Sequence, residues 1–282
     1  MATSIPYRPY LPGTFRWRLG LRPLELRDWI EIDDRYDADI AAKLEVLARH
    51  RDTVFVALDD IGPEASEVLD AMVAHLRERF PERFTDVEID DTLHPLDAAG
   101  RLVQEDLAIL VERGGRLVFG GGSICFPNRW DLRSKIGLPL SAVHAPVSQL
   151  NDQLGDPIER FFARLTPERS FWRLGWGVLD TDDLYQPLDG TAAPRPPAPA
   201  PADLHLRVER ETLRRFPATN CVLFTIRTYV APLSSIAEDP AEAARLAEAI
   251  EALPDDVADY KQLDEIGAVA AGWLRRAAPS AG

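Results

Sequence analysis

The segment 106–126, DLAILVERGGRLVFGGGSICF, decides the fold of this chain. Two apolar runs, 106–112 and 116–126, flank Gly114-Gly115, and a two-residue glycine turn between apolar runs predicts a β-hairpin. The second run contains Gly120-Gly121-Gly122, but no Lys-Ser or Lys-Thr follows and the dinucleotide-binding spacing is absent, which excludes a phosphate loop. Glycines inside a strand indicate instead a β-bulge or a close approach of the backbone to a bound group.

Hydrophobic periodicity predicts further elements on both sides of the hairpin. Three strands are expected after it, at 170–179, 204–213 and 220–230, and the last is the richest in β-branched and aromatic residues. Helices are expected at 25–31, 38–50, 64–80, 156–165, 240–252 and 255–276. The β-branched run 53–58 is short and ends in turn-forming residues, so the first third of the chain is expected to be helical. This pattern predicts an α+β protein with a mostly antiparallel sheet of about five strands and helical extensions at both ends.

The chain is expected to form a single domain, 1–282, in three parts. Residues 1–100 are assigned to an N-terminal arm and helices, 101–235 to the core sheet, and 236–282 to closing helices. The Pro/Ala-rich stretch 191–202 lies between two expected strands, so we interpret it as an extended surface loop and not as a domain boundary.

Composition limits the partners and the cellular compartment. The formal net charge of -14 disfavours a nucleic-acid or anionic-membrane binder, because phosphate contacts need clustered Lys and Arg. Cys125 and Cys221 lie far apart and support neither a disulfide framework nor a cysteine-based zinc or iron–sulfur site. No signal peptide or membrane-spanning stretch is recognisable, so a soluble, cytoplasmic protein is expected.

His144 has the most unusual setting of the histidines. It precedes Ala145-Pro146, and because proline disfavours the α-conformation in the residue before it, His144 is expected on a loop or at a helix end. An imidazole there can ligate a metal or haem iron or exchange a proton, although the residues alone favour a loop histidine bonded to backbone. His75 and His94 are both expected to be exposed to solvent.

Five phrases of the sequence carry a resemblance to a known family. They are LGLRPLELRDWIEID at 19–33, DLAILVE at 106–112, ICFPNRWDLRSKIGLPLSAVHAPV at 124–147, LRVERETLRRFP at 206–217 and VLFTIRTYV at 222–230. With these phrases the chain resembles the haem subunit of the haem-dependent oxidative N-demethylases, the bacterial dimethylamine monooxygenases. The resemblance spans nearly the whole chain.

The resemblance implies a PAS-like sheet that binds haem b, activates O2 and removes a methyl group from a small amine such as dimethylamine. It also implies partner subunits, a reductase that passes electrons from NADPH through FMN and a 2Fe-2S cluster. This chain contains no flavin or iron–sulfur motif, which fits that division of labour.

The resemblance also implies roles for individual residues. His144 would be the iron ligand, since neutral imidazole is a common axial ligand of haem, and Arg173 and Glu209 would form a polar catalytic site. The residues expected to contact the haem are Arg129, Trp130, Lys135 and Tyr229, with Arg133 as a further candidate.

Each assignment has a structural alternative. Arg173 and Glu209 can be a cross-strand ion pair, and the basic residues at 129, 133 and 135 can be a solvated helix face. Tyr229 shares a strand face with Arg227, and that face can be the solvent side while Phe224, Ile226 and Thr228 point to the core. At least two of Arg210, Arg214 and Arg215 are expected to face solvent.

The sequence departs from the family pattern at Gly175, where the family tends to have asparagine, and this leaves more room and one polar group fewer. The substrate can therefore differ from dimethylamine. Two other functions stay open: a haem-based gas or redox sensor, and a haem-free interaction protein of the same fold. Iron ligation by Cys125 or Cys221 is a weaker rival to His144.

Overall fold

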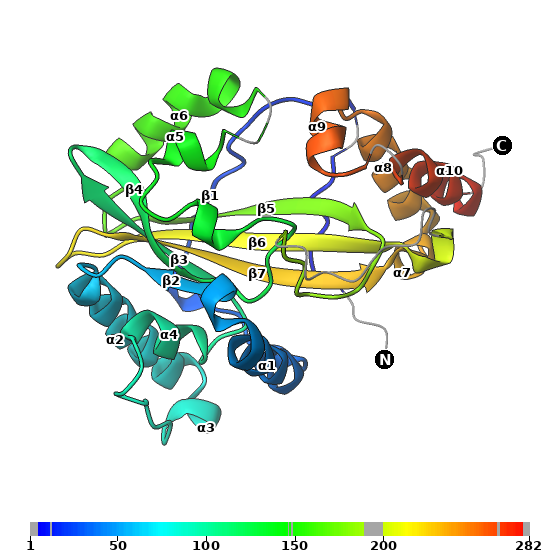
Figure 1. Cartoon of the computed structure of the whole chain (residues 1–282). Coiled ribbons are helices and arrows are strands. Elements are labelled where there is room, and N and C mark those ends of the chain that lie inside the picture. The colour runs from blue at the N-terminus through cyan, green and yellow to red at the C-terminus, as the bar shows by residue number, and fades with distance from the viewer. Residues whose placement is uncertain are drawn as a thin grey trace.

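A computed structural model describes residues 5–11, 13–145, 147, 149–188, 200–263 and 266–278. Its centre is an open sheet of seven antiparallel strands in the order β1-β5-β6-β7-β3-β4-β2 (Figure 1). The strands are β1 (Arg22–Leu24), β2 (Phe55–Ala57), β3 (Asp106–Arg113), β4 (Arg116–Ser123), β5 (Ser170–Leu179), β6 (His205–Arg215) and β7 (Val222–Pro232).

The predicted α+β class, the hairpin and the three later strands are confirmed. β3 and β4 are joined by Gly114 and Gly115, which both have positive φ, and a register shift between Ile109 and Leu110 is the expected bulge. The estimate of five strands is wrong, because β1 and β2 add two strands of three residues each at the sheet edges. Three residues are too few to display the period-two alternation that identifies a strand in a sequence. The PAS-like character of the core and the single-domain organisation stay predictions.

The glycines of β4 serve packing within the chain itself. A Cβ on Gly121 would lie 2.8 Å from Ile61 Cδ1 and 3.1 Å from the Val56 carbonyl oxygen. The close approach expected at this position is therefore made by β2 and by the residue that precedes α2, and not by a bound group.

Helices flank the sheet on both sides. They are α1 (Tyr36–Val54), α2 (Gly62–Arg79), α3 (Pro81–Phe84), α4 (Pro95–Gly100), α5 (Leu140–Val143), α6 (Leu150–Arg164), α7 (Leu233–Ala237), α8 (Pro240–Glu251), α9 (Asp255–Tyr260) and α10 (Gly267–Ala277), with 3-10 turns η1 (Leu26–Asp28), η2 (Leu132–Ser134) and η3 (Pro201–Asp203). The helix expected at 25–31 is only the turn η1. The single helix expected at 255–276 is two helices, and Gln262, with φ of 55°, lies where the chain leaves the helical conformation between them.

The two faces of the sheet have different surroundings. Residues directly opposite one another in neighbouring strands share a face. The pairs Arg173–Glu211 and Gly175–Glu209 therefore mark one face, which we call the Arg173 face. The pairs Arg210–Arg227 and Val208–Tyr229 mark the other, which we call the Tyr229 face.

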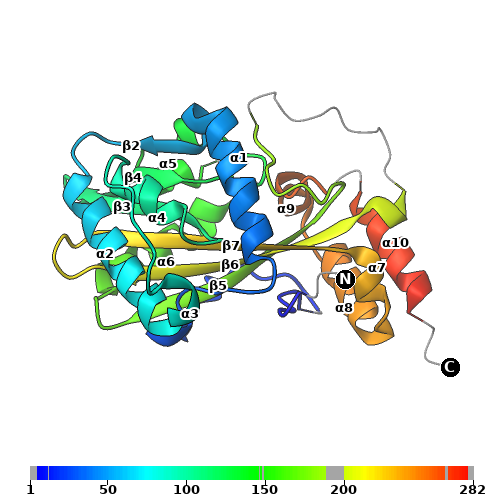
Figure 2. The ribbon, with the colours of Figure 1, turned by 90° about the horizontal axis from the view of Figure 1, so that it is seen from below.

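Most helices cover the Tyr229 face. Helices α1–α4 lie across one end of it, and α7, α8 and α10 gather at the other end, as the view from below shows (Figure 2). The Arg173 face carries α5 and α6 over an apolar cluster with Leu110, Phe119 and Leu213, while α9 lies farther along β5 (Figure 1). In the described ranges, no helix is both long and apolar enough to cross a membrane.

Several predictions of exposure are wrong. His75 is buried against Trp29, with ring centroids 5.3 Å apart, although it was expected in solvent. Arg210 and Arg215 are also buried, so at most one of the three arginines expected at the surface reaches it freely. Their guanidinium groups donate to backbone carbonyl oxygens, Arg210 to those of Asp28 and Trp29 and Arg215 to those of Asn220 and Phe162. These hydrogen bonds offset the cost of burying the two charges.

Candidate functional site

His144 caps the C-terminal end of α5, as the Ala-Pro that follows it predicted. Burial, and then the positive charges of Arg173 and Lys135, lower the pKa of its imidazole to about 4. Within the described part of the chain the imidazole has no hydrogen-bond partner. At neutral pH it is therefore an uncharged ring with both nitrogens uncommitted, which is the form that ligates metals.

The Arg173 face presents two guanidinium–carboxylate pairs. Arg173 Nε donates to Glu211 Oε2 at 2.5 Å, and Arg207 Nε donates to Glu209 Oε1 at 2.8 Å. From the sequence, a cross-strand ion pair between Arg173 and Glu209 was considered. Arg173 does form a cross-strand ion pair, but its partner is Glu211, because the strand register places Arg173 opposite Glu211. The Arg173 side chain stays 36% exposed within this cluster, whereas that of Arg207 is only 1% exposed.

Gly175 lets both carboxylates approach the strand. A Cβ at Gly175 would lie 3.3 Å from Glu211 Oε1 and 3.6 Å from Glu209 Oε2. These are the two oxygens that the arginines leave free, and they converge on one point above the strand. Burial and the neighbouring Glu209 raise the pKa of Glu211 against the opposing effect of Arg173. We call this arrangement the carboxylate cradle.

Space lies beside the carboxylate cradle. Gly177, two residues along on the same face, is buried, yet a Cβ added there would meet no atom within 4 Å. Arg207 stands opposite Gly177 in β6, and its Nη1 is a buried donor without a hydrogen-bond partner in the described residues. Buried donors are rarely left unpaired, so Arg207 Nη1 can bind a water or a ligand group that enters this space.

The end of α9 closes the site at the edge of β5. Lys261 Nζ donates to the Trp176 carbonyl oxygen at 2.5 Å. Burial lowers the pKa of Lys261 in spite of the opposing effect of Glu209 and Glu211. Tyr260 is 51% exposed, and the partial desolvation of its hydroxyl beside the same two carboxylates raises its pKa. The last residue of α9, Tyr260, and the residue after it, Lys261, therefore belong to the surroundings of Arg173.

The basic residues of the segment before α5 have different roles. Arg129 is buried and binds Asp180 at 2.5 Å and Gln262 at 2.6 Å, which joins the segment to the residues after β5 and α9. Arg133 pairs with Asp131 close to the surface. Lys135 Nζ donates to the Val143 carbonyl oxygen at 3.2 Å, beside His144, and Trp130 packs on the apolar cluster of the Arg173 face. Of these residues, Lys135 is the one whose charge acts on His144.

Tyr229 lies on the other face of the sheet. Its hydroxyl donates to Glu31 Oε2 at 2.5 Å, and Tyr7 donates to the other oxygen of the same carboxylate. Arg227, stacked 4.6 Å from the Tyr229 ring, binds Asp33 at 2.7 Å. The Tyr229 face is therefore not exposed to solvent at this position, and it does not line the site around Arg173. A group bound beside Arg173 would not contact Tyr229.

Sequence reasoning missed Glu211, Arg207, Tyr260 and Lys261. The first two were within reach, because Arg207, Glu209 and Glu211 alternate along one strand and must share a face. The α9 residues carried no such signal, since their position depends on how the C-terminal helices fold back.

The two cysteines are buried, and burial raises the thiol pKa to about 12 for Cys125 and about 11 for Cys221.

These features define a class of protein: an α+β protein with one open antiparallel sheet, whose partly open polar face holds an uncharged histidine and a pair of carboxylates. The family model described as haem-dependent oxidative N-demethylase, alpha subunit-like, matches residues 20–271. The match covers most of the chain, so the chain belongs to this family, and the predicted family is confirmed. The family description names haem, an oxidative N-demethylation and an alpha subunit, which implies further subunits in a complex.

Proposed function

We propose that this chain is the haem-binding subunit of an oxidative amine N-demethylase, with His144 as the iron ligand. The observation that carries the proposal is the uncharged His144 imidazole beside Arg173 and Lys135, over the face that holds the carboxylate cradle. Membership of the family supports the haem and the reaction class. The proposal extends to the substrate, a small methylated amine, and to a separate reductase.

The residues of the Arg173 face fit a haem. His144 offers an uncharged nitrogen, the surface over Gly177 is open to at least a methyl-sized group, and the unpaired Nη1 of Arg207 offers a buried donor. Lys135 and Lys261 are cations suited to the two propionate groups. When bound, the haem would supply the activation of O2 that amine oxidation needs.

The carboxylate cradle suits a protonated amine. A small ammonium between Glu209 Oε2 and Glu211 Oε1 would receive two charge-assisted hydrogen bonds, while Arg173 and Arg207 hold the opposite oxygens in place. Arg173 and Arg207 also balance the two negative charges, so the cradle binds through directed hydrogen bonds more than through net charge.

The reaction sets a requirement for a partner. Removing one methyl group from an amine with O2 consumes two electrons and two protons, and releases formaldehyde, water and the demethylated amine. We propose that a reductase subunit supplies these electrons from NADPH through FMN and a 2Fe-2S cluster. The subunit name of the family supports a multi-subunit enzyme.

The test of the haem assignment is an absorption spectrum. Protein produced with haem precursor should have a Soret band at near one haem per chain, and His144→Ala should lose that band or shift it. His50→Ala, a histidine of α1 whose ring stacks on Tyr185, is the matched control and should keep the spectrum. A Soret band unchanged in His144→Ala would remove His144 as the ligand.

The test of the activity is formaldehyde release. Haem-loaded protein with O2, a methylated amine and a chemical or enzymatic reductant should release one formaldehyde per amine consumed. Haem binding without formaldehyde from any small methylated amine would contradict the enzymatic function and leave the gas or redox sensor.

A further inference from the structure

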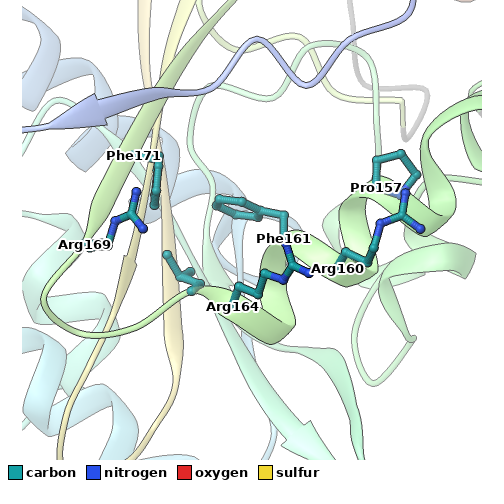
Figure 3. Close-up of a pocket in the computed structure, with 7 residues that line it drawn as sticks. Pro157, Arg160, Phe161, Arg164, Arg169 and Phe171 are labelled. Carbon is teal, nitrogen blue, oxygen red and sulfur yellow. The ribbon is translucent and has the colours of Figure 1, made fainter.

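A groove lies along the C-terminal half of α6, next to the start of β5. Its volume is about 360 Å³ (Figure 3). It is lined by Pro157, Arg160, Phe161 and Arg164 of α6, by Leu165 and Arg169 after it, and by Phe171 of β5. We call it the arginine groove.

The arginine groove is lined by three cations, Arg160, Arg164 and Arg169. Among the described residues, Arg164 and Arg169 have no carboxylate within ion-pair distance, and the pair of Arg160 with Asp156 is long, at 3.8 Å, and largely exposed. Figure 3 shows Arg160, Arg164 and Arg169 along the groove beside Phe161 and Phe171. The lining of the groove thus contains three arginines and no carboxylate, while Asp156, Glu159 and Glu168 belong to the same segment of the chain but not to the lining.

The groove adjoins the candidate site. Phe171, in its floor, and Arg173, in the site, lie on the same strand and the same face. Two residues of β-strand span roughly 7 Å. A protein bound in the groove would therefore lie close to the carboxylate cradle.

We propose that the arginine groove docks an acidic surface of the protein that delivers electrons to this subunit. The occupant is identified by charge: guanidinium groups pair with carboxylates, and aromatic floors with arginine rims are typical of protein interfaces. Complementary charge also accelerates association between two proteins that are both acidic overall. This inference rests on the proposed function, because it assigns the donor's docking site.

The experiment uses the full-length chain and a reduced acidic 2Fe-2S ferredoxin as the probe. Binding is measured by calorimetry at several salt concentrations, with and without haem in the chain. The groove variant is Arg160→Glu/Arg164→Glu/Arg169→Glu. The control variant, Arg16→Glu/Arg49→Glu/Arg77→Glu, changes three exposed arginines elsewhere and shifts the net charge equally.

The groove variant should weaken ferredoxin binding at least tenfold at low salt, and should remove most of the salt dependence. The control variant should weaken it less than threefold. Equal weakening by the two variants would assign the effect to net charge and overturn the proposal, as would a wild-type chain that does not bind the acidic probe at low salt.

The two proposals fail in different ways. If the chain does not bind haem, but the groove variant alone binds ferredoxin more weakly, the docking site is supported and the enzymatic function is contradicted. If the haem spectrum and formaldehyde release are present but ferredoxin binding is insensitive to the groove variant, the function stands and the docking site falls. Inorganic phosphate is then added at millimolar concentration as a competitor. If phosphate displaces ferredoxin and the two variants bind ferredoxin equally, the groove binds anions without specificity, which would contradict the docking site.

Discussion

At the scale of single residues, the candidate site depends on two carboxylates that are not equivalent. Glu211 is buried and bound to Arg173, whereas Glu209 is more exposed and bound to Arg207. Losing the charge of Glu211 removes the carboxylate that pairs with Arg173, whereas Arg207 keeps its hydrogen bonds to the Phe126 carbonyl oxygen and the Thr228 hydroxyl when Glu209 loses its charge. The two glutamates should therefore respond differently to the same substitution.

Glu209→Gln should weaken binding of a methylated amine to the haem-loaded protein about tenfold or more, because one charge-assisted hydrogen bond becomes a neutral one. Its melting temperature should stay near that of the wild type. Glu211→Gln should weaken amine binding and also lower the melting temperature. Spectral titration and thermal unfolding measure the two effects, and identical behaviour of the two variants would contradict the distinct roles.

Gly175→Ala places a methyl group in the carboxylate cradle, 3.3 Å from Glu211 Oε1. We expect amine affinity to fall on the order of tenfold, as for one misplaced methyl group in a binding pocket. Gly155→Ala, in α6 and outside the carboxylate cradle, is the matched control, because a Cβ there meets no atom within 4 Å. Spectral titration compares them, and equal amine affinities of the two variants would show that the cradle does not hold the amine.

At the scale of elements, buried ion pairs attach helices to strands. Lys43 of α1 is fully buried, and its Nζ lies 3.5 Å from Asp106 Oδ1 at the start of β3 and 3.1 Å from the Val103 carbonyl oxygen. Asp106 in turn accepts hydrogen bonds from the backbone N–H groups of Cys125 and Phe126, after β4. One lysine thus fixes α1, the start of β3 and the segment that leads to the site.

Lys43→Met should destabilise the chain by about 3–5 kcal/mol, because it leaves the buried Asp106 carboxylate without a cation. Adding Asp106→Asn to that variant should recover part of the loss, since the uncompensated charge is then gone. Urea unfolding of the single and double variants provides the measurement. A single-variant loss below about 1 kcal/mol would mean that water reaches this pair.

At the scale of the whole molecule, buried histidines make stability depend on pH. Burial, with the nearby charges of Arg214 and Arg79, lowers the pKa of His75 to about 4 from 6.5. The unfolded chain therefore binds a proton between these values that the folded chain does not, and stability falls as the pH drops from 6.5 towards 4. His144 acts in the same direction in the chain without haem.

His75→Gln, which cannot take up a proton, should flatten the dependence of the free energy of unfolding on pH across this window. The wild type should lose about 3 kcal/mol more than the variant between neutral pH and pH 4. Urea unfolding at a series of pH values measures both proteins. Parallel curves for the two would mean that His75 is protonated equally in the folded and unfolded states.

The sequence by itself determined the elements whose information is local. The hairpin at Gly114-Gly115, the strands β5–β7 and the place of His144 at a helix end all follow from turn residues, period-two alternation and proline, which act within a few residues. Five phrases of the sequence were also sufficient to identify the family. Local signals of this kind do not depend on how distant parts of the chain pack.

Only the tertiary structure decided which residues meet. The partner of Arg173 is Glu211 and not Glu209 because the β5–β6 register is set by pairing along the whole strand, and a shift of one residue would exchange the two faces. Tyr229 lies away from the site because its side of β7 packs against the N-terminal segment, where its hydroxyl binds Glu31, a residue far away in sequence. Lys261 reaches the site only because α9 folds back onto the edge of β5. Such contacts depend on long-range packing, which no local pattern in the sequence records.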